Sequence, residues 1–231
     1  MLRMILSSTG SFYFTILNLL YPQDCLICSN RIHEAKDARL CAPCNNRIMR
    51  YADTPHWSFT EQGLAFDAAY HVADYDDIVK RCICLMKYDG KQDLSKILGG
   101  LMTEYAERNM NFSDIDMFVP VPLHPVKLRE RQFNQSELIA GHLAEKFDKK
   151  LENKWIKRIR YTPQQAGLSR EKRFRNIKGA FLVRQDADFN GKSVMLIDDV
   201  MATGATLHEC AKAIKSAGAK KVYAFTLARG N

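Results

Sequence analysis

The sequence predicts an α/β fold built on a mainly parallel, twisted sheet, with a smaller module in front of it. From residue 65 onward, short apolar runs alternate with stretches of helical periodicity. This alternation is typical of a parallel sheet covered by helices on both faces. Four of the seven cysteines lie in the first 44 residues, which indicates a separate small unit. We therefore expect a helix over residues 1–22, a cysteine module over 23–50 and an α/β domain over 64–231.

The alternating pattern predicts individual elements of the α/β domain. Residues 51–63 are polar and contain Pro55, which favours a linker or an irregular crossing. Strands are expected at residues 65–72, 117–119, 155–159, 181–183, 194–197 and 222–227. Helices are expected at residues 76–88, 94–108, 133–147 and 206–217.

Composition and charge restrict the classes of function. With 231 residues, of which 46% are hydrophobic and 26% charged, the chain can bury one core plus an accessory module. The net charge of +8 favours anionic partners. Charge alone does not distinguish a small phosphorylated ligand from a nucleic acid.

The N-terminal apolar stretch, residues 12–21, is interrupted by Thr15 and Asn18. It is shorter than the roughly 20 apolar residues that a membrane span needs. No small-residue cleavage site of the secretory kind follows it, so we expect an amphipathic helix and no membrane span. Cys82, Cys84 and Cys210 lie in apolar helical patterns, where reduced core thiols are expected. Reduced thiols predict a cytoplasmic location.

The first four cysteines form two Cys-x-x-Cys pairs, Cys25 with Cys28 and Cys41 with Cys44. Two such pairs supply the four thiolates of a closed tetrahedral zinc site, whereas a pair of disulfides is the alternative. In a reducing compartment we favour structural zinc. With all four positions filled by protein, no open position remains for catalysis at this metal.

A second chemical motif follows the apolar run at residues 194–197. Asp198 and Asp199 stand at its C-terminal end, the edge of a parallel sheet where ligands bind. A small-residue loop containing Thr203 and Gly204 then opens a helix, and its backbone N–H groups can hold a phosphate. Carboxylates repel an anion, so their targets are sugar hydroxyls or a bridging divalent cation. The alternative is that the acid pair only caps a turn.

This arrangement of four apolar residues, two acids and Thr-Gly-x-Thr resembles the type I phosphoribosyltransferase signature. The resemblance implies that Asp198 and Asp199 are the catalytic acids and contact the ribose hydroxyls of 5-phosphoribosyl 1-diphosphate. It implies that the 5-phosphate lies on the loop formed by Met201, Ala202, Thr203, Gly204, Ala205 and Thr206. Magnesium would arrive with the diphosphate.

Over nearly its whole length the chain is similar to the ComF family of competence-associated proteins. The segments that carry the similarity are residues 19–22, 86–88, 119–124, 131–135 and 176–181, together with Gln165, Leu168, Ser169 and Arg173. Two positions depart from the family pattern, with Gln132 for a usual Gly and Ala202 for a usual Thr. The resemblance implies that Lys87, Arg129, Arg131, Asn134 and Gln135 face the diphosphate. The alternative for each is an exposed helix residue.

Residues 154–175 are rich in Lys and Arg, with Trp155, Tyr161 and Phe174 interleaved. Cations alternating with aromatic residues suit single-stranded nucleic acid, and we name Arg170, Arg173 and Arg175 as candidate contacts. The alternative is a flexible flap that closes over the sugar diphosphate.

Two functional hypotheses follow. The first is a protein that binds 5-phosphoribosyl 1-diphosphate with Mg²⁺ and serves DNA uptake, with pentosyl transfer if it is an active enzyme. The second is a single-stranded DNA-binding module of the competence machinery, partnered with a helicase, whose sugar-phosphate pocket is regulatory or degenerate. A purely structural adaptor is a third alternative. The acceptor and the oligomeric state stay open.

Overall fold

The computed structural model describes residues 23–32, 39–52, 56–59, 63–162, 167 and 169–230. The chain divides into two compact units, Met1–Ile48 and Met49–Asn231, and each is described by itself. The helix predicted for residues 1–22 lies outside the described residues. In the described part of the chain, no helix is both long and apolar enough to span a bilayer.

The first unit is small. Strands β1 (Gln23–Asp24) and β2 (Arg31–Ile32) form an antiparallel pair, and helix α2 (Ala42–Ala52) begins beside the second cysteine pair. Among the described residues of this unit, the buried apolar side chains are those of Cys25, Ile32, Leu40, Cys44 and Ile48. Modules of this size commonly depend on a metal or disulfide staple.

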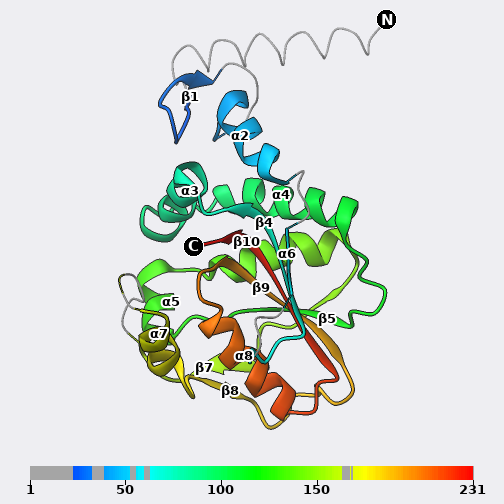
Figure 1. The fold of residues 1–231 in the computed structure, drawn as a ribbon. Helices are drawn as coiled ribbons and strands as arrows, with labels where there is room; N and C mark the ends of the chain where they lie inside the picture. Colours follow the sequence, from blue (N-terminus) through cyan, green and yellow to red (C-terminus); the bar gives the residue numbers. More distant parts are fainter. Residues whose placement is uncertain are drawn as a thin grey trace, which may run out of the picture. The chain divides into compact units, whose positions relative to one another are not determined.

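The second unit is built on a six-stranded sheet with the order β3-β4-β10-β9-β5-β6 (Figure 1). All neighbouring strands are parallel except β3 and β4, which are antiparallel. The strands are β3 (His56–Phe59), β4 (Ala68–Asp74), β5 (Met117–Pro120), β6 (Lys150–Leu151), β9 (Ser193–Met201) and β10 (Lys221–Arg229). The predicted fold class, a mainly parallel α/β sheet behind a cysteine module, is confirmed.

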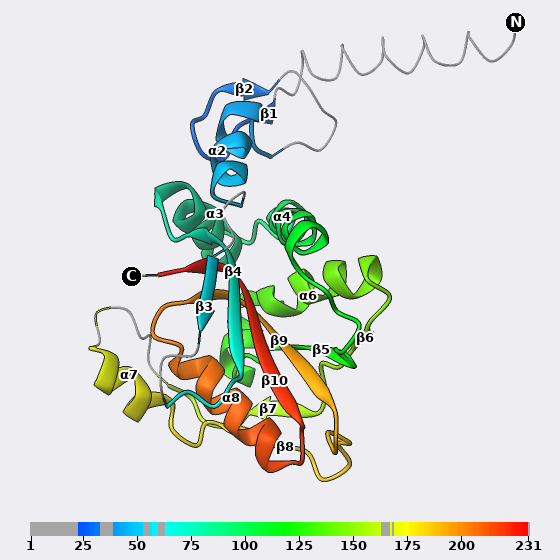
Figure 2. The same cartoon turned by 45° about the vertical axis from the view of Figure 1, so that its right-hand side comes forward.

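Helices cover both faces of this sheet (Figure 2). They are α3 (Asp77–Tyr88), α4 (Leu94–Asn109), α5 (Pro125–Arg131), α6 (Gln135–Lys146), α7 (Arg170–Ile177) and α8 (Ala205–Ser216). On one face α4 packs against α6, and the Tyr105 ring of α4 stacks on Phe225 of β10 with centroids 6.0 Å apart. On the other face, Leu207, Cys210 and Ile214 of α8 belong to the same apolar cluster as alternate residues of β5, β9 and β10.

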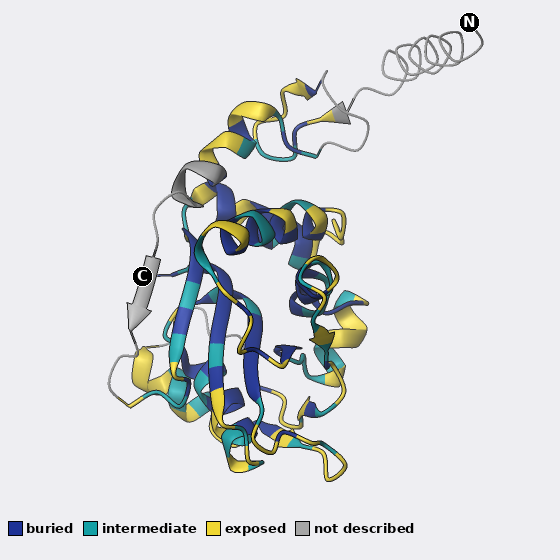
Figure 3. Cartoon of the chain, turned by 90° about the vertical axis from the view of Figure 1, so that its right-hand side faces the viewer, coloured by how far each residue is buried: buried dark blue, intermediate teal, exposed yellow. Residues whose placement is uncertain are grey.

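Burial follows from this arrangement (Figure 3). The central strands β9 and β10 are buried over most of their length; the positions that are not fully buried are Asp198 and Val200 in β9 and Lys221, Tyr223 and Arg229 in β10. Fully buried strands read as continuous apolar runs, which is why both were visible in the sequence. The exposed side chains gather on the outer faces of the helices and in the loops.

Some elements differ from the sequence-based expectation. Strand β3 lies within residues 51–63, where a linker was expected, and it pairs with the edge of β4. Strands β7 (Ile156–Arg158) and β8 (Phe181–Val183) form a separate antiparallel pair instead of joining the main sheet. Helices α5 and α7 were not predicted, because they are short and their sequences lack an apolar stripe.

The end of β9 positions the acid pair. We expected the strand to stop at Ile197, but it continues to Met201 because β10 runs beside it, pairing Thr226 with Asp198. On its other side, β5 pairs with β9 only as far as Ile197. Asp198 and Asp199 therefore stand at the edge of the sheet, where one neighbouring strand has already ended.

Candidate functional sites

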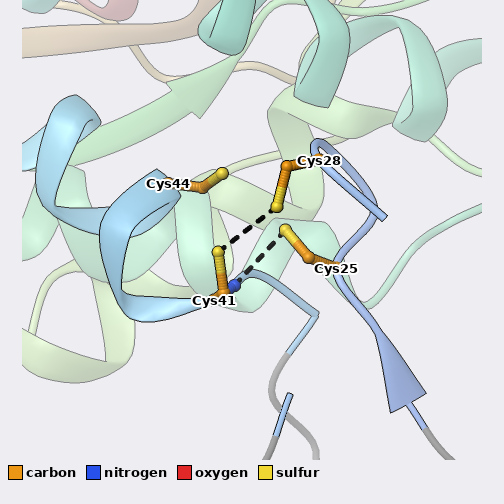
Figure 4. Close-up of side chains that lie close together, drawn as sticks. All are labelled: Cys25, Cys28, Cys41 and Cys44. Atoms are coloured by element: carbon orange, nitrogen blue, oxygen red, sulfur yellow. Dashed lines mark hydrogen bonds between the residues drawn. The ribbon is translucent and has the colours of Figure 1, made fainter. Parts of the chain in front are cut away.

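The four N-terminal cysteines come together (Figure 4). Their sulfur atoms all lie within 4.8 Å of one another, and the Sγ atoms of Cys28 and Cys41 are 3.6 Å apart. A tetrahedron with Zn–S bonds of about 2.3 Å has an edge of roughly 3.8 Å. All seven cysteines of the chain are free thiols, so the disulfide alternative is not what the structure holds. The geometry and the soft sulfur donors suit a structural zinc ion.

Backbone groups prepare this cluster for a cation. Burial opposes ionisation of Cys25, but N–H groups of Cys28, Cys41 and Ile27 outweigh it and lower the pKa of this thiol to about 6. One of these donors, the Cys41 N–H, lies 3.4 Å from the Cys25 sulfur. Burial and the neighbouring thiols raise the pKa of Cys44. Four thiols this close cannot all ionise without a compensating positive charge, which zinc supplies.

In the second unit, the loop after β9 encloses a small hollow of about 70 Å³. All six residues of the predicted phosphate loop line it, with Asp198, Val200 and Leu207. Gly204 has φ +74°, and its carbonyl accepts the first hydrogen bond of α8 from the His208 N–H. This left-handed turn lets the helix begin within the loop, so that the helix N-terminus adjoins the hollow. Such a helix end is suited to an anion.

A larger cavity of about 460 Å³ adjoins the hollow and shares four of its lining residues, Asp198, Val200, Ala202 and Thr206. Two acidic side chains line it, those of Asp198 and Asp199. Five strongly basic side chains face the same space, those of Lys87, Lys127, Arg131, Arg158 and Arg173. Basic groups therefore exceed acidic groups among the described lining residues.

The acid pair has specific partners at the N-terminus of α6 and the C-terminus of α3. The Ser136 hydroxyl donates to Asp198 Oδ1 at 2.7 Å, and the Asp199 N–H donates to the same oxygen at 2.9 Å. The Lys87 ammonium lies 2.9 Å from Asp199 Oδ1 and 2.7 Å from Oδ2. Burial, followed by the charge of Asp199, raises the pKa of Asp198 to about 7. Burial and the neighbouring carboxylate therefore favour the protonated form of Asp198.

Two buried polar atoms in residues that line the cavity have no hydrogen-bond partner within the described part of the chain. They are Gln135 Oε1 and Arg158 Nε. Buried polar groups are normally paired, so unpaired ones beside a cavity are suited to a polar ligand. Together they offer an acceptor and a cationic donor, the groups that recognise hydroxyls and phosphates.

The predicted basic residues divide into two sets. Arg131 lines the cavity and lies 5.5 Å from the ring centroid of Tyr88, whereas Arg129 is exposed and is not among the lining residues. Lys87 lines the cavity, but its closest anionic group is Asp199. Asn134 instead caps α6, with its side chain bonded to the Val121 carbonyl.

The three arginines of α7 are also divided. Arg173 lines the cavity. Arg170 lies 5.8 Å from the ring centroid of Phe174, and Arg175 faces Glu171 at 3.7 Å on the exposed side of the helix. Sequence reasoning did not single out Ser136, Lys127 or Arg158 as ligand contacts. Two weak signals were available in the sequence. Ser136 directly follows the segment 131–135 that resembles the family, and Arg158 lies in the basic stretch 154–175.

Comparison with known proteins bears on this geometry. Residues 134–231 match the phosphoribosyl transferase domain family, and residues 16–55 match the double zinc ribbon domain family. Competence protein F from Haemophilus influenzae is 27% identical over 221 residues, covering 89% of this chain and 96% of that protein. The chain is a homologue of the ComF proteins. The resemblance seen in the sequence is thereby confirmed.

Other relatives of this ComF homologue have similar coverage. DNA utilization protein YhgH from Escherichia coli is 27% identical, covering 89% of each chain. Competence protein ComFC from Streptococcus pneumoniae is 25% identical, covering 94% of this chain and 93% of that protein. Among solved structures, a hypoxanthine phosphoribosyltransferase from Staphylococcus aureus matches 58% of this chain and 64% of its own, at 15% identity. Its TM-score against this chain is 0.39.

Proposed function

We propose that the second unit binds 5-phosphoribosyl 1-diphosphate with Mg²⁺. One observation carries the proposal. The hollow at the N-terminus of α8 adjoins the larger cavity, which is lined by basic side chains, and the carboxylates of Asp198 and Asp199 stand at the edge between them. A ligand with a phosphate at one end, hydroxyls in the middle and a diphosphate at the other end matches that order of groups. The phosphoribosyl transferase family match supports the same ligand class.

In this proposal the 5-phosphate occupies the hollow. Backbone N–H groups at the start of α8 and the hydroxyls of Thr203 and Thr206 would donate to its oxygens. Ala202 lacks the hydroxyl that the family pattern has there, but its backbone still belongs to the loop. No acid other than Asp198 lines this hollow among the described residues.

The acid pair would receive the ribose hydroxyls. Asp198 and Asp199 line the shared edge, and carboxylate oxygens accept hydrogen bonds from adjacent hydroxyls. Their hard oxygen donors also fit Mg²⁺, which would supply charge neutralisation for the diphosphate. Ser136 and the Asp199 N–H fix the orientation of the Asp198 carboxylate before any ligand enters.

The diphosphate would face the basic wall of the cavity. Arg131, Arg158 and Arg173 present planar guanidinium groups, which bind phosphate oxygens in pairs. Arg158 also donates to Thr162, which holds it against the cavity. The wall therefore draws on three elements, α5, β7 and α7.

We further propose that this binding serves DNA uptake in the cytoplasm. The support comes from the names of the relatives, which are competence and DNA utilization proteins at 25–27% identity over most of the chain. Zinc held by the four cysteines would stabilise the first unit in that role.

Calorimetric titration of 5-phosphoribosyl 1-diphosphate with Mg²⁺ tests the proposed ligand. Wild type should bind, and the Asp198→Asn plus Asp199→Asn variant should not. Two arginines of α5 give a matched comparison, because Arg131 lines the cavity and Arg129 does not. Arg131→Ala should weaken binding tenfold or more, whereas Arg129→Ala should bind as wild type does. Absence of binding to zinc-loaded wild type would refute the proposal, and diphosphate release with an added acceptor would show turnover.

A second candidate function, binding of single-stranded DNA, is favoured by one observation. Tyr161 is 48% exposed, with Lys127 5.7 Å from its ring centroid and the exposed basic side of α7 following it in the chain. An exposed aromatic ring among cations can stack on a base. All three aromatics of the stretch contact another ring, Trp155 that of Phe189 and Phe174 that of His208. Tyr161 meets His124 edge-on with ring centroids 5.5 Å apart, and it is still 48% exposed.

Fluorescence anisotropy with a labelled oligodeoxythymidine tests this second candidate. Tyr161→Ala and the Arg170→Ala plus Arg175→Ala variant should both weaken binding, and the arginine variant should also reduce the salt slope. Arg184→Ala is the matched control, because Arg184 is exposed and ion-paired to Asp186 as Arg175 is to Glu171. Equal affinity in all variants would exclude this surface.

A further inference from the structure

Lys87 has a position that ligand binding alone does not explain. Its ammonium group lies within 3 Å of both carboxylate oxygens of Asp199, and both side chains are largely buried, at 20% and 8% exposure. The pKa of Lys87 is raised, because attraction to Asp199 outweighs the effect of burial. The ammonium is therefore a fixed positive charge on the acid pair.

A divalent cation binding to this acid pair would need the same oxygens. Among the described residues that line the cavity, Asp198 and Asp199 are the only acids, so no other carboxylate is available to Lys87 there. A cation at Asp199 would have to displace Lys87 or stand beside it, and like charges at such distances repel strongly in a buried site. The hydrogen bond from Ser136 already occupies one oxygen of Asp198.

We propose that Lys87 is a tethered counter-ion that keeps divalent cations off the acid pair until a ligand carrying a diphosphate enters the cavity. The inference rests on the proposed function, because it requires that ligand. An ammonium has three N–H donors, and the two Asp199 oxygens account for two of them. Diphosphate oxygens give Lys87 a second anionic partner, and the cation then enters together with the ligand.

The local structure supports a device of this kind. Lys87 lies in the last turn of α3, and the adjacent Tyr88 is 60% exposed, with Arg131 of α5 over its ring. Lys87 and Arg131 both line the cavity. An entering diphosphate therefore meets cations from both α3 and α5, and of Lys87 and Arg131 it is Lys87 that is ion-paired to an acid of the pair.

Binding of Mn²⁺, followed by electron paramagnetic resonance, tests the inference without any catalytic readout. In the absence of other ligands, Lys87→Gln should bind Mn²⁺ at least tenfold more tightly than wild type. Lys87→Arg keeps the positive charge and should behave as wild type. The double change Lys87→Gln plus Asp199→Asn should lose the gained affinity. Equal Mn²⁺ affinity of Lys87→Gln and wild type would overturn the inference.

Removal of Lys87 leaves Asp199 without its partner, so folding must be controlled. Zinc content and circular dichroism report on folding, and Lys87→Asn is a second neutral variant that can still donate a hydrogen bond. Should neither neutral variant fold, nuclear magnetic resonance of wild type decides. Paramagnetic broadening of the Ser136 and Val200 amide signals by Mn²⁺ alone would overturn the inference, and its absence would support it.

The two proposals fail separately. Wild type that binds 5-phosphoribosyl 1-diphosphate, combined with unchanged Mn²⁺ affinity in Lys87→Gln, would refute the counter-ion role and leave the proposed function intact. Wild type that does not bind the sugar diphosphate would refute the function. The Mn²⁺ comparison would still show whether Lys87 excludes cations.

Discussion

Replacing Gly204 with Ala tests the left-handed turn that opens the phosphate loop. At φ +74° a Cβ costs about 1–2 kcal/mol relative to the right-handed region. The added atom would meet Leu64 Cδ1 at 3.4 Å and Phe66 Cζ at 3.6 Å, which are ordinary contacts. The expected loss therefore comes from the backbone conformation and not from a clash.

Gly100→Ala is the matched control, because Gly100 lies within α4 and a Cβ there meets nothing within 4 Å. Both changes reduce the conformational freedom of the unfolded chain equally, so that contribution cancels between them. The difference in the free energy of unfolding should be about 1–2 kcal/mol, or roughly 2–8 °C in the midpoint of thermal unfolding for a chain of this size. Gly100→Ala should be the more stable.

Thermal unfolding of the zinc-loaded proteins, followed by circular dichroism, measures this difference. Titration with inorganic phosphate should show weaker binding by Gly204→Ala and unchanged binding by Gly100→Ala, because only Gly204 adjoins the hollow. Equal unfolding midpoints of the two variants would refute the reasoning about backbone strain at this loop.

Three further predictions concern charge and metal. Lys87→Met should lower the free energy of unfolding, measured with urea, by about 3 kcal/mol. This is the low end of the range for a broken buried ion pair, because the Lys87 side chain keeps 20% exposure. Adding Asp199→Asn should restore most of the lost stability. Because the folded pKa of Asp198 is raised to about 7, the folded state holds a proton that the unfolded state has lost, so stability should fall as pH rises from about 4 to 7. Asp198→Asn should flatten that slope, and an unchanged slope would contradict the assigned burial. Purified protein should contain one zinc per chain by metal analysis, with Cys44→Ser losing it and the control Cys84→Ser retaining it, since Cys84 lies outside the cluster.

Part of the fold could be predicted from the sequence because its signals are local. The apolar runs of β9 and β10 and the amphipathic patterns of α3 and α8 report burial directly. The strand β3 could not be predicted, because its place depends on the free edge of β4. Helix α7 is held by tertiary contacts, with Arg160 donating to the Asn176 and Lys178 carbonyls.

The candidate site shows the same division. The phosphate loop is contiguous, so its residues could be named from the sequence. The pairing of Lys87 with Asp199 joins positions 112 residues apart, and that of Ser136 with Asp198 joins positions 62 apart. Only the arrangement of the strands and helices brings these together. The resemblance to the family suggested Lys87 as a ligand contact. Its pairing with Asp199 could be found only from the structure.

Gln132 shows how the chain departs from its family without losing the local turn. The residue has φ +67°, the left-handed conformation that explains the usual Gly at this position. Here the Gln132 side chain donates to the Arg129 carbonyl, and the backbone N–H donates to the Leu128 carbonyl at the end of α5. These bonds offset part of the cost of a side chain in that conformation.

The position of β10 between β4 and β9 has a consequence for biosynthesis. Asp67, just before β4, accepts a hydrogen bond from the Val222 N–H, 155 residues further along the chain. Until β10 has left the ribosome, no strand joins β4 to β9, and each of them presents one edge of unpaired backbone N–H and C=O groups. At about 5–20 residues per second, the 155 residues that separate Asp67 from Val222 take roughly 8 to 31 seconds to synthesise, so β4 has the long wait and β9 only a short one. We expect the nascent chain to depend on a holding chaperone during this time, and the sheet to close only after translation of its last strand.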